Sequence, residues 1–273
     1  EFMKKDLQKL RIVLGAVGLS TVLSLSGCTT QNTSEVEEGL EEENTEENGM
    51  QEVSSGLTCV IVQDYEDCMN HTYFYKLSIY SEDGIHAFDI VKSSWREVEE
   101  FLSYDLFSDI TTLQSWFNGF DTDTKEIDLT FTKNYPKLSK LFVDNLGTLE
   151  INTTAVSEMT NLNDLILNNC GITDIKAFNK LTALNYCELN KNQIKRREGY
   201  EFPASLQYLN LANNQIEDLS NVEAPKKQIS MNLAGNYLTE DDREALERLG
   251  LGSMADYILE NQKAEMALIK NNH

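Results

Sequence analysis

The chain has 273 residues, a formal net charge of −22 at neutral pH and three histidines. This acid excess argues against nucleic acid as a partner and against docking on anionic lipid headgroups, because both carry negative charge. The few histidines, and the lack of a glycine-rich phosphate loop, a nucleophile elbow or a paired-cysteine motif, argue against an enzyme, a cofactor and a metal site.

The segment 1–27 has the composition of a cleaved leader. Residues 1–2 precede the first methionine and are interpreted as a cloning remnant. A basic segment at 4–11 leads into an apolar run at 12–25, which is too short to span a membrane. The run ends in Leu-Ser-Gly-Cys, which resembles the lipobox of bacterial lipoproteins. That resemblance implies that Cys28 carries lipid, palmitate included, and becomes the mature N-terminus; an uncleaved anchor is the alternative.

Lipid chains on Cys28 would hold the protein at the cell membrane, on its extracytoplasmic face, which is the cell surface. Residues 28–56 are acidic and nearly free of apolar side chains, and they include the run 41–43 of three glutamates. Such a segment cannot bury enough surface to fold. We therefore predict a disordered linker that spaces the folded part from the membrane, with cation binding as the alternative.

Residues 57–122 have the pattern of a small β-rich and helical lobe. Apolar residues alternate or cluster at 57–63, 73–80 and 85–92, which predicts strands, and a helix is expected to start in 94–101. The lobe is expected to cap the first repeat. A distinct binding module is the alternative, because the sequence pattern does not separate the two roles.

A polar cluster in this lobe carries the second functional hypothesis, a metal-binding or enzymatic accessory. Five side chains that could ligate a metal lie close together, and the alternative is an ordinary polar loop, which we favour. They are Asp64, Glu66, Asp67, Cys68 and His71.

Two cysteines flank a predicted turn in the same lobe. Outside the reducing cytosol, a disulfide between Cys59 and Cys68 is one hypothesis. A reduced Cys59 inside a strand is the alternative.

From Leu162 onward one frame of apolar positions, L-x-x-L-x-L-x-x-N/C-x-I/L, recurs at starting positions 162, 184, 206 and 228, which are 22 residues apart. Towards the N-terminus the frame fits less well. It can be placed from Leu146 at a shorter interval, or Leu138–Val143 can supply the strand instead, so the register between 124 and 160 stays open.

This pattern, with Ile172-Thr-Asp-Ile175 and Ile216-Glu-Asp-Leu219 after the Asn position, resembles the internalin-like leucine-rich repeats of bacterial proteins. The resemblance covers about residues 124–240. It implies an α/β solenoid in which leucine-rich repeats at 123–239 wind as a right-handed superhelix and stack their leucines into one core.

Each repeat is expected to place one polar side chain at the buried turn after its strand, where it hydrogen-bonds backbone groups of neighbouring coils. These positions form an Asn/Cys ladder of Cys170, Asn192, Asn214 and Asn236. After the repeats, residues 240–273 have capping-box starts and helical spacing, which predicts a C-terminal helical cap for the open end of the solenoid.

Residues between the frame leucines point away from the core and build the concave face. The candidate ligand-binding residues on it are Glu150, Asp164, Ile166, Tyr186, Glu188, Tyr208 and Asn210. Tyrosines beside carboxylates predict binding of a protein or peptide, with a cationic partner the best match, by a monomeric, non-enzymatic surface protein that serves adhesion or envelope interactions. The alternative is that an exposed sheet tolerates these residues without any partner.

Overall fold

A computed structural model describes residues 56–67, 72–81, 84–104, 107–117, 126–147, 150–195, 201, 203–220 and 222–263; of residues 64–67, 72, 73 and 88 it describes the backbone only. All of them belong to one compact unit that begins at Gly56. The elements in chain order are β1 (Leu57–Asp67), β2 (Thr72–Ser81), β3 (His86–Lys92), α2 (Trp95–Leu102), β4 (Ile110–Trp116), β5 (Glu126–Ile127), η2 (Thr130–Asn134), β6 (Lys140–Asp144), β7 (Glu150–Ile151), α3 (Thr153–Ser157), β8 (Asp164–Asn168), η3 (Lys176–Lys180), β9 (Tyr186–Glu188), β10 (Tyr208–Asn210), β11 (Ser230–Asn232), η4 (Glu240–Asp242), α4 (Arg243–Arg248), η5 (Gly252–Met254) and α5 (Ala255–Glu260).

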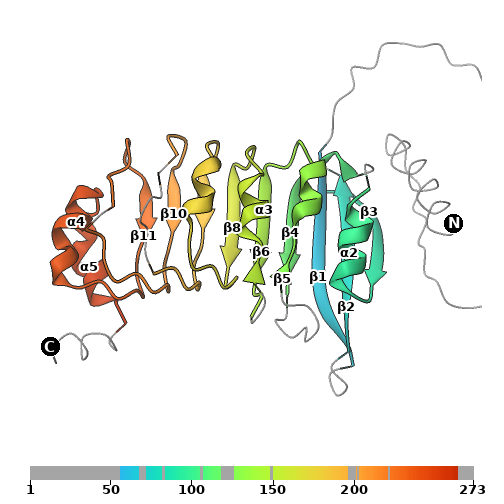
Figure 1. Ribbon diagram of the computed structural model, residues 1–273, viewed down its shortest axis with the longest axis horizontal. Coiled ribbons are helices and arrows are strands. Elements are labelled where there is room, and N and C mark those ends of the chain that lie inside the picture. The colour runs from blue at the N-terminus through green and yellow to red at the C-terminus, as the bar shows by residue number, and fades with distance from the viewer. Residues whose placement is uncertain are drawn as a thin grey trace, which may run out of the picture. The chain divides into compact units, whose positions relative to one another are not determined.

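Nine strands form one sheet in the order β11-β10-β9-β8-β6-β4-β1-β2-β3 (Figure 1). From β11 to β1 neighbouring strands run parallel, whereas β2 is antiparallel to β1 and β3 is antiparallel to β2. The strands expected in the N-terminal lobe therefore join the same sheet as the repeat strands. A mostly parallel sheet of this length gives the unit a solenoid-like architecture.

The parallel pairing places equivalent repeat residues side by side. Tyr186 pairs with Asp164 on one side and with Tyr208 on the other, and Tyr208 pairs with Ser230, so each partner is 22 positions away in the sequence. The leucines of the frame alternate with these residues and point into the core. The inward-facing strand residues, each at most 5% exposed, are Leu113, Leu141, Val143, Leu165, Leu167, Cys187, Leu209 and Met231.

The open question of register between 124 and 160 is decided by β6. Its Leu141 pairs with Leu165 of β8, and the interval between these two leucines is slightly longer than the regular repeat. The placement of the frame from Leu146 is wrong, because Leu146 follows the strand, as Cys170 follows β8, and both are fully buried. The segment β7 belongs instead to a two-stranded sheet with β5.

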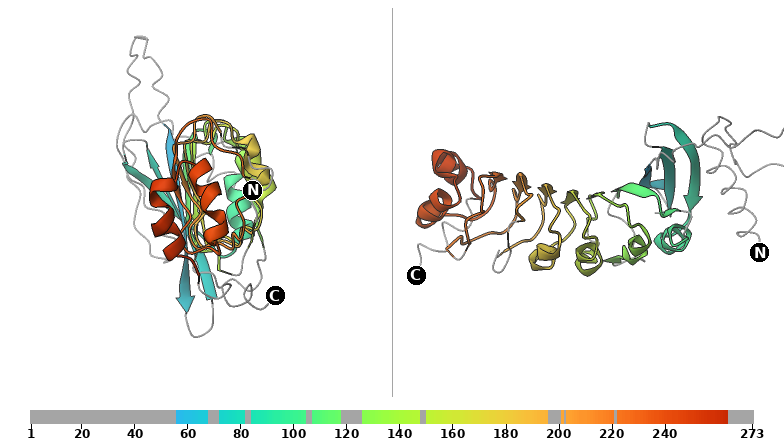
Figure 2. Two further views of the ribbon diagram at one scale, coloured as in Figure 1. Left: turned by 90° about the vertical axis from the view of Figure 1, so that its left-hand side faces the viewer. Right: turned by 90° about the horizontal axis from the view of Figure 1, so that it is seen from above.

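Short helices cover the other side of the sheet. In the right-hand panel of Figure 2 the helical turns lie along one side of the row of repeat strands. The helix α3 starts at Asn152, whose side chain accepts a hydrogen bond from the backbone N–H of Ala155 at 3.1 Å. The coils that follow β6 and β8 thus run from strand to turn to short helix and back, whereas those that follow β9 and β10 return without a helix in the described residues.

The asparagines of the ladder hydrogen-bond to backbone groups of neighbouring coils. The Oδ1 atom of Asn192 accepts from the N–H groups of Cys170 (2.9 Å) and Ile172 (3.2 Å). Its Nδ2 donates to the carbonyl of Leu167 at 2.7 Å. Backbone groups that the strand leaves without a partner are satisfied in this way. Bonds of the same kind are made by Asn214 and Asn236.

Cys170 occupies the first position of the Asn/Cys ladder. Its Sγ lies 3.4 Å from the carbonyl of Val143 and 3.3 Å from that of Asn168, so the thiol takes the place of an amide donor. Burial raises the pKa of this thiol and of the Cys187 thiol, which keeps both in the neutral form.

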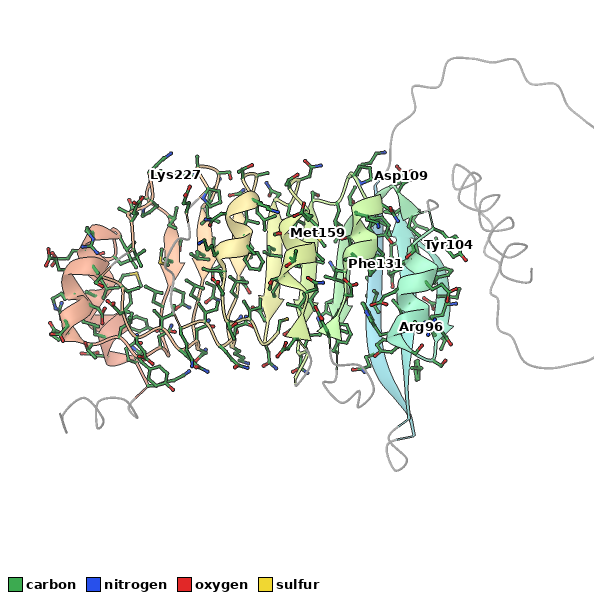
Figure 3. All side chains as sticks on the ribbon, viewed as in Figure 1. Arg96, Tyr104, Asp109, Phe131, Met159 and Lys227 are labelled. Carbon is green, nitrogen blue, oxygen red and sulfur yellow. The ribbon has the colours of Figure 1, made fainter. Side chains whose placement is uncertain are left out.

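An aromatic cluster fills the N-terminal end of the unit. Trp95, the first residue of α2, is 2% exposed, and its ring centroid lies 5.8 Å from that of Tyr75 and 5.5 Å from that of Phe117. Phe131, labelled in Figure 3, lies 6.4 Å from Trp95. Ser94 caps the N-terminus of this helix, and its side chain accepts a hydrogen bond from the backbone N–H of Glu97.

For Cys59 the structure fits the alternative to a disulfide, a reduced thiol inside a strand. Cys59 lies fully buried in β1 as a free thiol, and that strand continues to Asp67. Eight residues of extended strand span roughly 26 Å, whereas the two Cα atoms of a disulfide lie within about 7 Å. Asp67, at the end of β1, is therefore far from Cys59 along the strand, and Cys68 itself lies outside the described residues.

The last helices lie at the far end of the sheet, after β11 (Figure 1). The Oε1 atom of Gln262 accepts from the N–H groups of Asn236 (3.0 Å) and Leu238 (3.2 Å), and its Nε2 donates to the carbonyl of Leu233 at 3.2 Å. These are the bonds that a ladder asparagine makes to the coil before it. Gln262 therefore takes the role of one more ladder residue after the last repeat strand.

Candidate functional site

The face of the sheet away from the short helices, which we call the open face, carries the side chains that alternate with the buried leucines. Strand register aligns them in three rows. The tyrosine row is Thr112, Lys140, Asp164, Tyr186, Tyr208 and Ser230. The glutamate row is Gln114, Phe142, Ile166, Glu188, Asn210 and Asn232. The tryptophan row is Val91, Lys76, Val62, Trp116, Asp144 and Asn168.

Two tyrosines stack in the middle of the repeats. The ring centroids of Tyr186 and Tyr208 are 4.6 Å apart and their planes differ by 13°. The stack follows from the repeat itself, because parallel in-register strands place residues 22 positions apart next to each other. Each ring buries part of the other, so the pair is held as one rigid aromatic surface.

Glu188 is held in place beside this pair. One carboxylate oxygen accepts from the hydroxyl of Tyr186, and the other accepts from Nδ2 of Asn168 at 3.4 Å. Asn168 in turn accepts from Nδ2 of Asn190 at 2.6 Å. A carboxylate oriented by two donors is preorganised to meet a cationic group.

The two tyrosine hydroxyls stay protonated. Partial burial raises the pKa of Tyr186, and the hydrogen bond to Glu188 and its negative charge raise it further. Burial also raises the pKa of Tyr208, with a second contribution from the charge of Glu188. The pair therefore offers neutral phenols and one carboxylate, which suits recognition better than proton transfer.

The remaining candidate residues of the repeats lie on the same face. Asp164 forms an ion pair with Lys140, in which Nζ of the lysine lies 3.5 Å from Oδ2 of the aspartate. Part of the negative charge of Asp164 is therefore neutralised. Ile166 lies beside Phe142, and both are half-buried. Asn210 follows Glu188 along the glutamate row, and its Oδ1 accepts from the N–H of Ala212 at 3.0 Å.

Glu150 does not belong to this face. It lies in β7, which pairs with Glu126 and Ile127 of β5 in the second sheet. The prediction placed it one repeat before Ile166 by counting from the wrong frame. Phe142 occupies that position instead, because β6 is the strand next to β8.

Several residues of the open face were not predicted from the sequence, among them three large apolar ones. Phe142 lies on the strand whose register was left open, and Trp116 and Val62 lie on strands assigned to a separate lobe. A signal for them is present in the sequence. The leucines Leu113 and Leu141 stand in the same place before Trp116 and Asp144 as Leu165 does before Asn168. The frame can therefore be followed towards the N-terminus once intervals longer than the regular repeat are allowed.

The polar cluster of the metal hypothesis falls outside the side chains that are described. Asp64, Glu66 and Asp67 are placed by backbone in β1, while Cys68 and His71 lie outside the described residues. In the described part of the chain no group of three potential metal-ligating side chains comes together.

No family model matches the chain, and no curated protein is similar to it. Solved structures with similarity to it include an internalin C2 from Listeria monocytogenes, at 23% identity and a TM-score of 0.43, covering 54% of this chain and 61% of that one. Another is an internalin (inlF) from the same organism, at 20% identity and a TM-score of 0.34, covering 54% of each chain. The chain thus spans less than two thirds of the length of these internalins.

The helices that the structure describes are short. None of them is both long enough and apolar enough to span a bilayer.

Proposed function

We propose that this protein is a non-enzymatic, lipid-anchored surface protein that binds a protein or peptide through the open face of its leucine-rich-repeat sheet. The observation that carries the proposal is the stacked pair of Tyr186 and Tyr208 with the oriented carboxylate of Glu188 beside it. Rigid aromatic side chains next to a fixed charge are typical of the centres of protein interfaces.

The shape of the binding surface agrees with a macromolecular partner. The tyrosine and glutamate rows extend from β4 to β11 and the tryptophan row from β3 to β8, so the aromatic, amide and acidic side chains lie on one continuous sheet. A small molecule is usually enclosed in a concave pocket, whereas an extended sheet face suits a protein or an extended peptide. The C-terminal helices and Gln262 are proposed to cap the last repeat so that the core is closed at this end.

The membrane part of the proposal rests on the motif that ends at Cys28, which lies outside the described residues. Its test is Cys28→Ser in the producing cell, compared with wild type by fractionation and by incorporation of a palmitate label. Label and membrane association are expected only in the wild type. Equal membrane association of both would contradict a lipid anchor at this residue.

Binding is tested by chemical crosslinking and capture with the full chain, against envelope extract and against extracellular host proteins. The variant Tyr186→Ala/Tyr208→Ala/Glu188→Lys removes the rigid pair and reverses the charge. A matched control, Tyr257→Ala/Glu217→Lys, makes the same kinds of change at exposed residues off the three rows. Loss of one crosslinked partner in the first variant but not in the control supports the proposal. A partner kept by both variants would move the site off the repeats.

A further inference from the structure

Exposed apolar side chains gather at one corner of the open face. Among the described residues six large hydrophobic side chains are exposed: Val62, Ile85, Val91, Trp116, Met254 and Tyr257. Three of these lie in the tryptophan row, with exposures of 36% for Val62, 44% for Trp116 and 60% for Val91. Single exposed hydrophobic residues are ordinary, but several in one row on one sheet face mark a contact surface.

The sheet changes direction at this corner. In the right-hand panel of Figure 2 the strands β1 to β3 stand up from the line of repeat strands, on the side away from the short helices. The open face is therefore folded inward where Val62 of β1 meets Trp116 of β4. A side chain inserted at this place would contact two arms of the sheet at once, which excludes more water than a flat face does.

Around the corner the lysines are paired with carboxylates, whereas two carboxylates have no basic partner. Lys76 lies between Val91 and Val62 in the tryptophan row. Its Nζ forms an ion pair with Oδ2 of Asp89 at 2.9 Å. Lys140 is likewise paired with Asp164. Asp144, directly beside Trp116, and Glu188, two strands further along, form no ion pair with any basic side chain that the structure describes. The surface next to the apolar corner therefore offers negative charge to a partner.

We propose that the corner at Val62 and Trp116, together with Asp144 and Glu188, binds a partner segment that carries an aromatic or aliphatic side chain followed by basic side chains. Neighbouring strands are about 4.8 Å apart, and Glu188 lies three strands from Trp116 and two residues earlier in register, so the two carboxylates lie roughly 5 Å and 16 Å from Trp116. An extended segment advances about 3.3 Å per residue, which places its basic residues near one or two and near four or five positions after the apolar one. This inference rests on the proposed function and specifies the chemistry of the partner.

The test is selection from a random dodecapeptide library displayed on phage, with the purified full chain as the target. The expected result is enrichment of peptides that combine a large apolar residue with Arg or Lys at those spacings. Enrichment of acidic peptides, or no enrichment over an empty support, would overturn the inference.

Selected peptides without tryptophan are then titrated while the tryptophan emission is followed. The chain has two tryptophans, and Trp95 is buried, so a change reports on Trp116. Trp116→Ala, measured with labelled peptide, is expected to weaken binding by about tenfold or more, as for a central anchor. Asp144→Asn/Glu188→Gln is expected to weaken binding several-fold and to reduce its dependence on salt.

Two control variants keep the test specific. Ile85→Ala removes an exposed apolar side chain that lies outside the tryptophan row, and Glu217→Gln removes an exposed carboxylate away from the open face. Both are expected to bind the peptides as the wild type does. All variants are compared by circular dichroism and thermal unfolding, and equal loss in the control variants would overturn the assignment.

This result can fail independently of the proposed function. One outcome is that crosslinking of the partner requires Tyr186, Tyr208 and Glu188, while Trp116→Ala leaves the affinity for the selected peptides unchanged. In that case the open face binds a partner, but the apolar corner is not its anchor. If no partner depends on either part of the face, the proposed function itself fails.

Discussion

One residue in each coil leaves the strand with a left-handed backbone. The equivalent positions, with φ between 53° and 67°, are Asn145, Asn169, Lys191, Asn213 and Gly235. Glycine and asparagine adopt this conformation at little cost, whereas a lysine does not. Lys191→Asn is therefore expected to raise the free energy of unfolding by about 0.5–1 kcal/mol. Urea unfolding measures it, with Lys195→Asn at an exposed position without positive φ as the control. No gain over that control would contradict the assignment of strain.

The ladder asparagines should matter far more than exposed polar residues. Asn214 is fully buried, accepts from the N–H of Ile194 at 3.1 Å and donates to the carbonyl of Leu189 at 2.8 Å. Asn214→Ala leaves these buried groups without partners and is expected to lower the free energy of unfolding by about 2–4 kcal/mol. Gln193→Ala, at an exposed position, is the matched control and should change it by less than about 0.5 kcal/mol. Equal effects would refute the ladder.

The positions and contacts of single residues were predicted correctly where the repeat is regular. The position of Asn192 and the contact of Tyr186 with Tyr208 follow directly from the 22-residue period, because strand pairing converts equal spacing into neighbours. Residues 64–67 were expected in a turn between Cys59 and Cys68 because most of them are polar, and that expectation was wrong. Backbone pairing with β2 extends β1 through them, and such pairing does not depend on apolar side chains.

Among the elements, the segment that follows α5 is expected to stabilise the last repeat through the side chain of Gln262, in addition to the backbone hydrogen bonds of that segment and the side-chain hydrogen bond of Lys263. Gln262→Ala removes the bonds to the N–H groups of Asn236 and Leu238 and is expected to lower the free energy of unfolding by about 1–3 kcal/mol. Hydrogen exchange at these two amides should speed up more than elsewhere. Glu260→Ala, exposed on α5, serves as the control. Unchanged exchange at both amides would show that Gln262 does not complete the ladder.

The sequence predicted the elements of the regular repeats but not how the N-terminal strands join them. The four regular repeats were found because their frame is intact, but β4, β6 and β8 follow one another at longer and unequal intervals, which a fixed period misses. The joining of β1 to β4 could not be predicted, because parallel pairing between distant segments leaves no local pattern. The apolar corner of the open face was missed for the same reason.

For the whole molecule, a sheet that runs without a break predicts cooperative unfolding of the unit that begins at Gly56. Both tryptophans, Trp95 and Trp116, lie towards its N-terminal end, whereas far-ultraviolet circular dichroism reports on all strands and helices. The two signals are expected to change at the same urea concentration, because β4 is paired to both β1 and β6. Separate transitions would show that the N-terminal strands and the repeats fold independently.

The central claim is that a protein partner contacts the open face, and site-specific photocrosslinking in intact cells tests it most directly. A photoreactive amino acid replaces Asn210 on the open face in one variant and Glu217, off the three rows, in another. The account predicts a discrete adduct from position 210 that is absent from position 217. Adducts from position 217 alone, or the absence of any adduct from position 210, would contradict it.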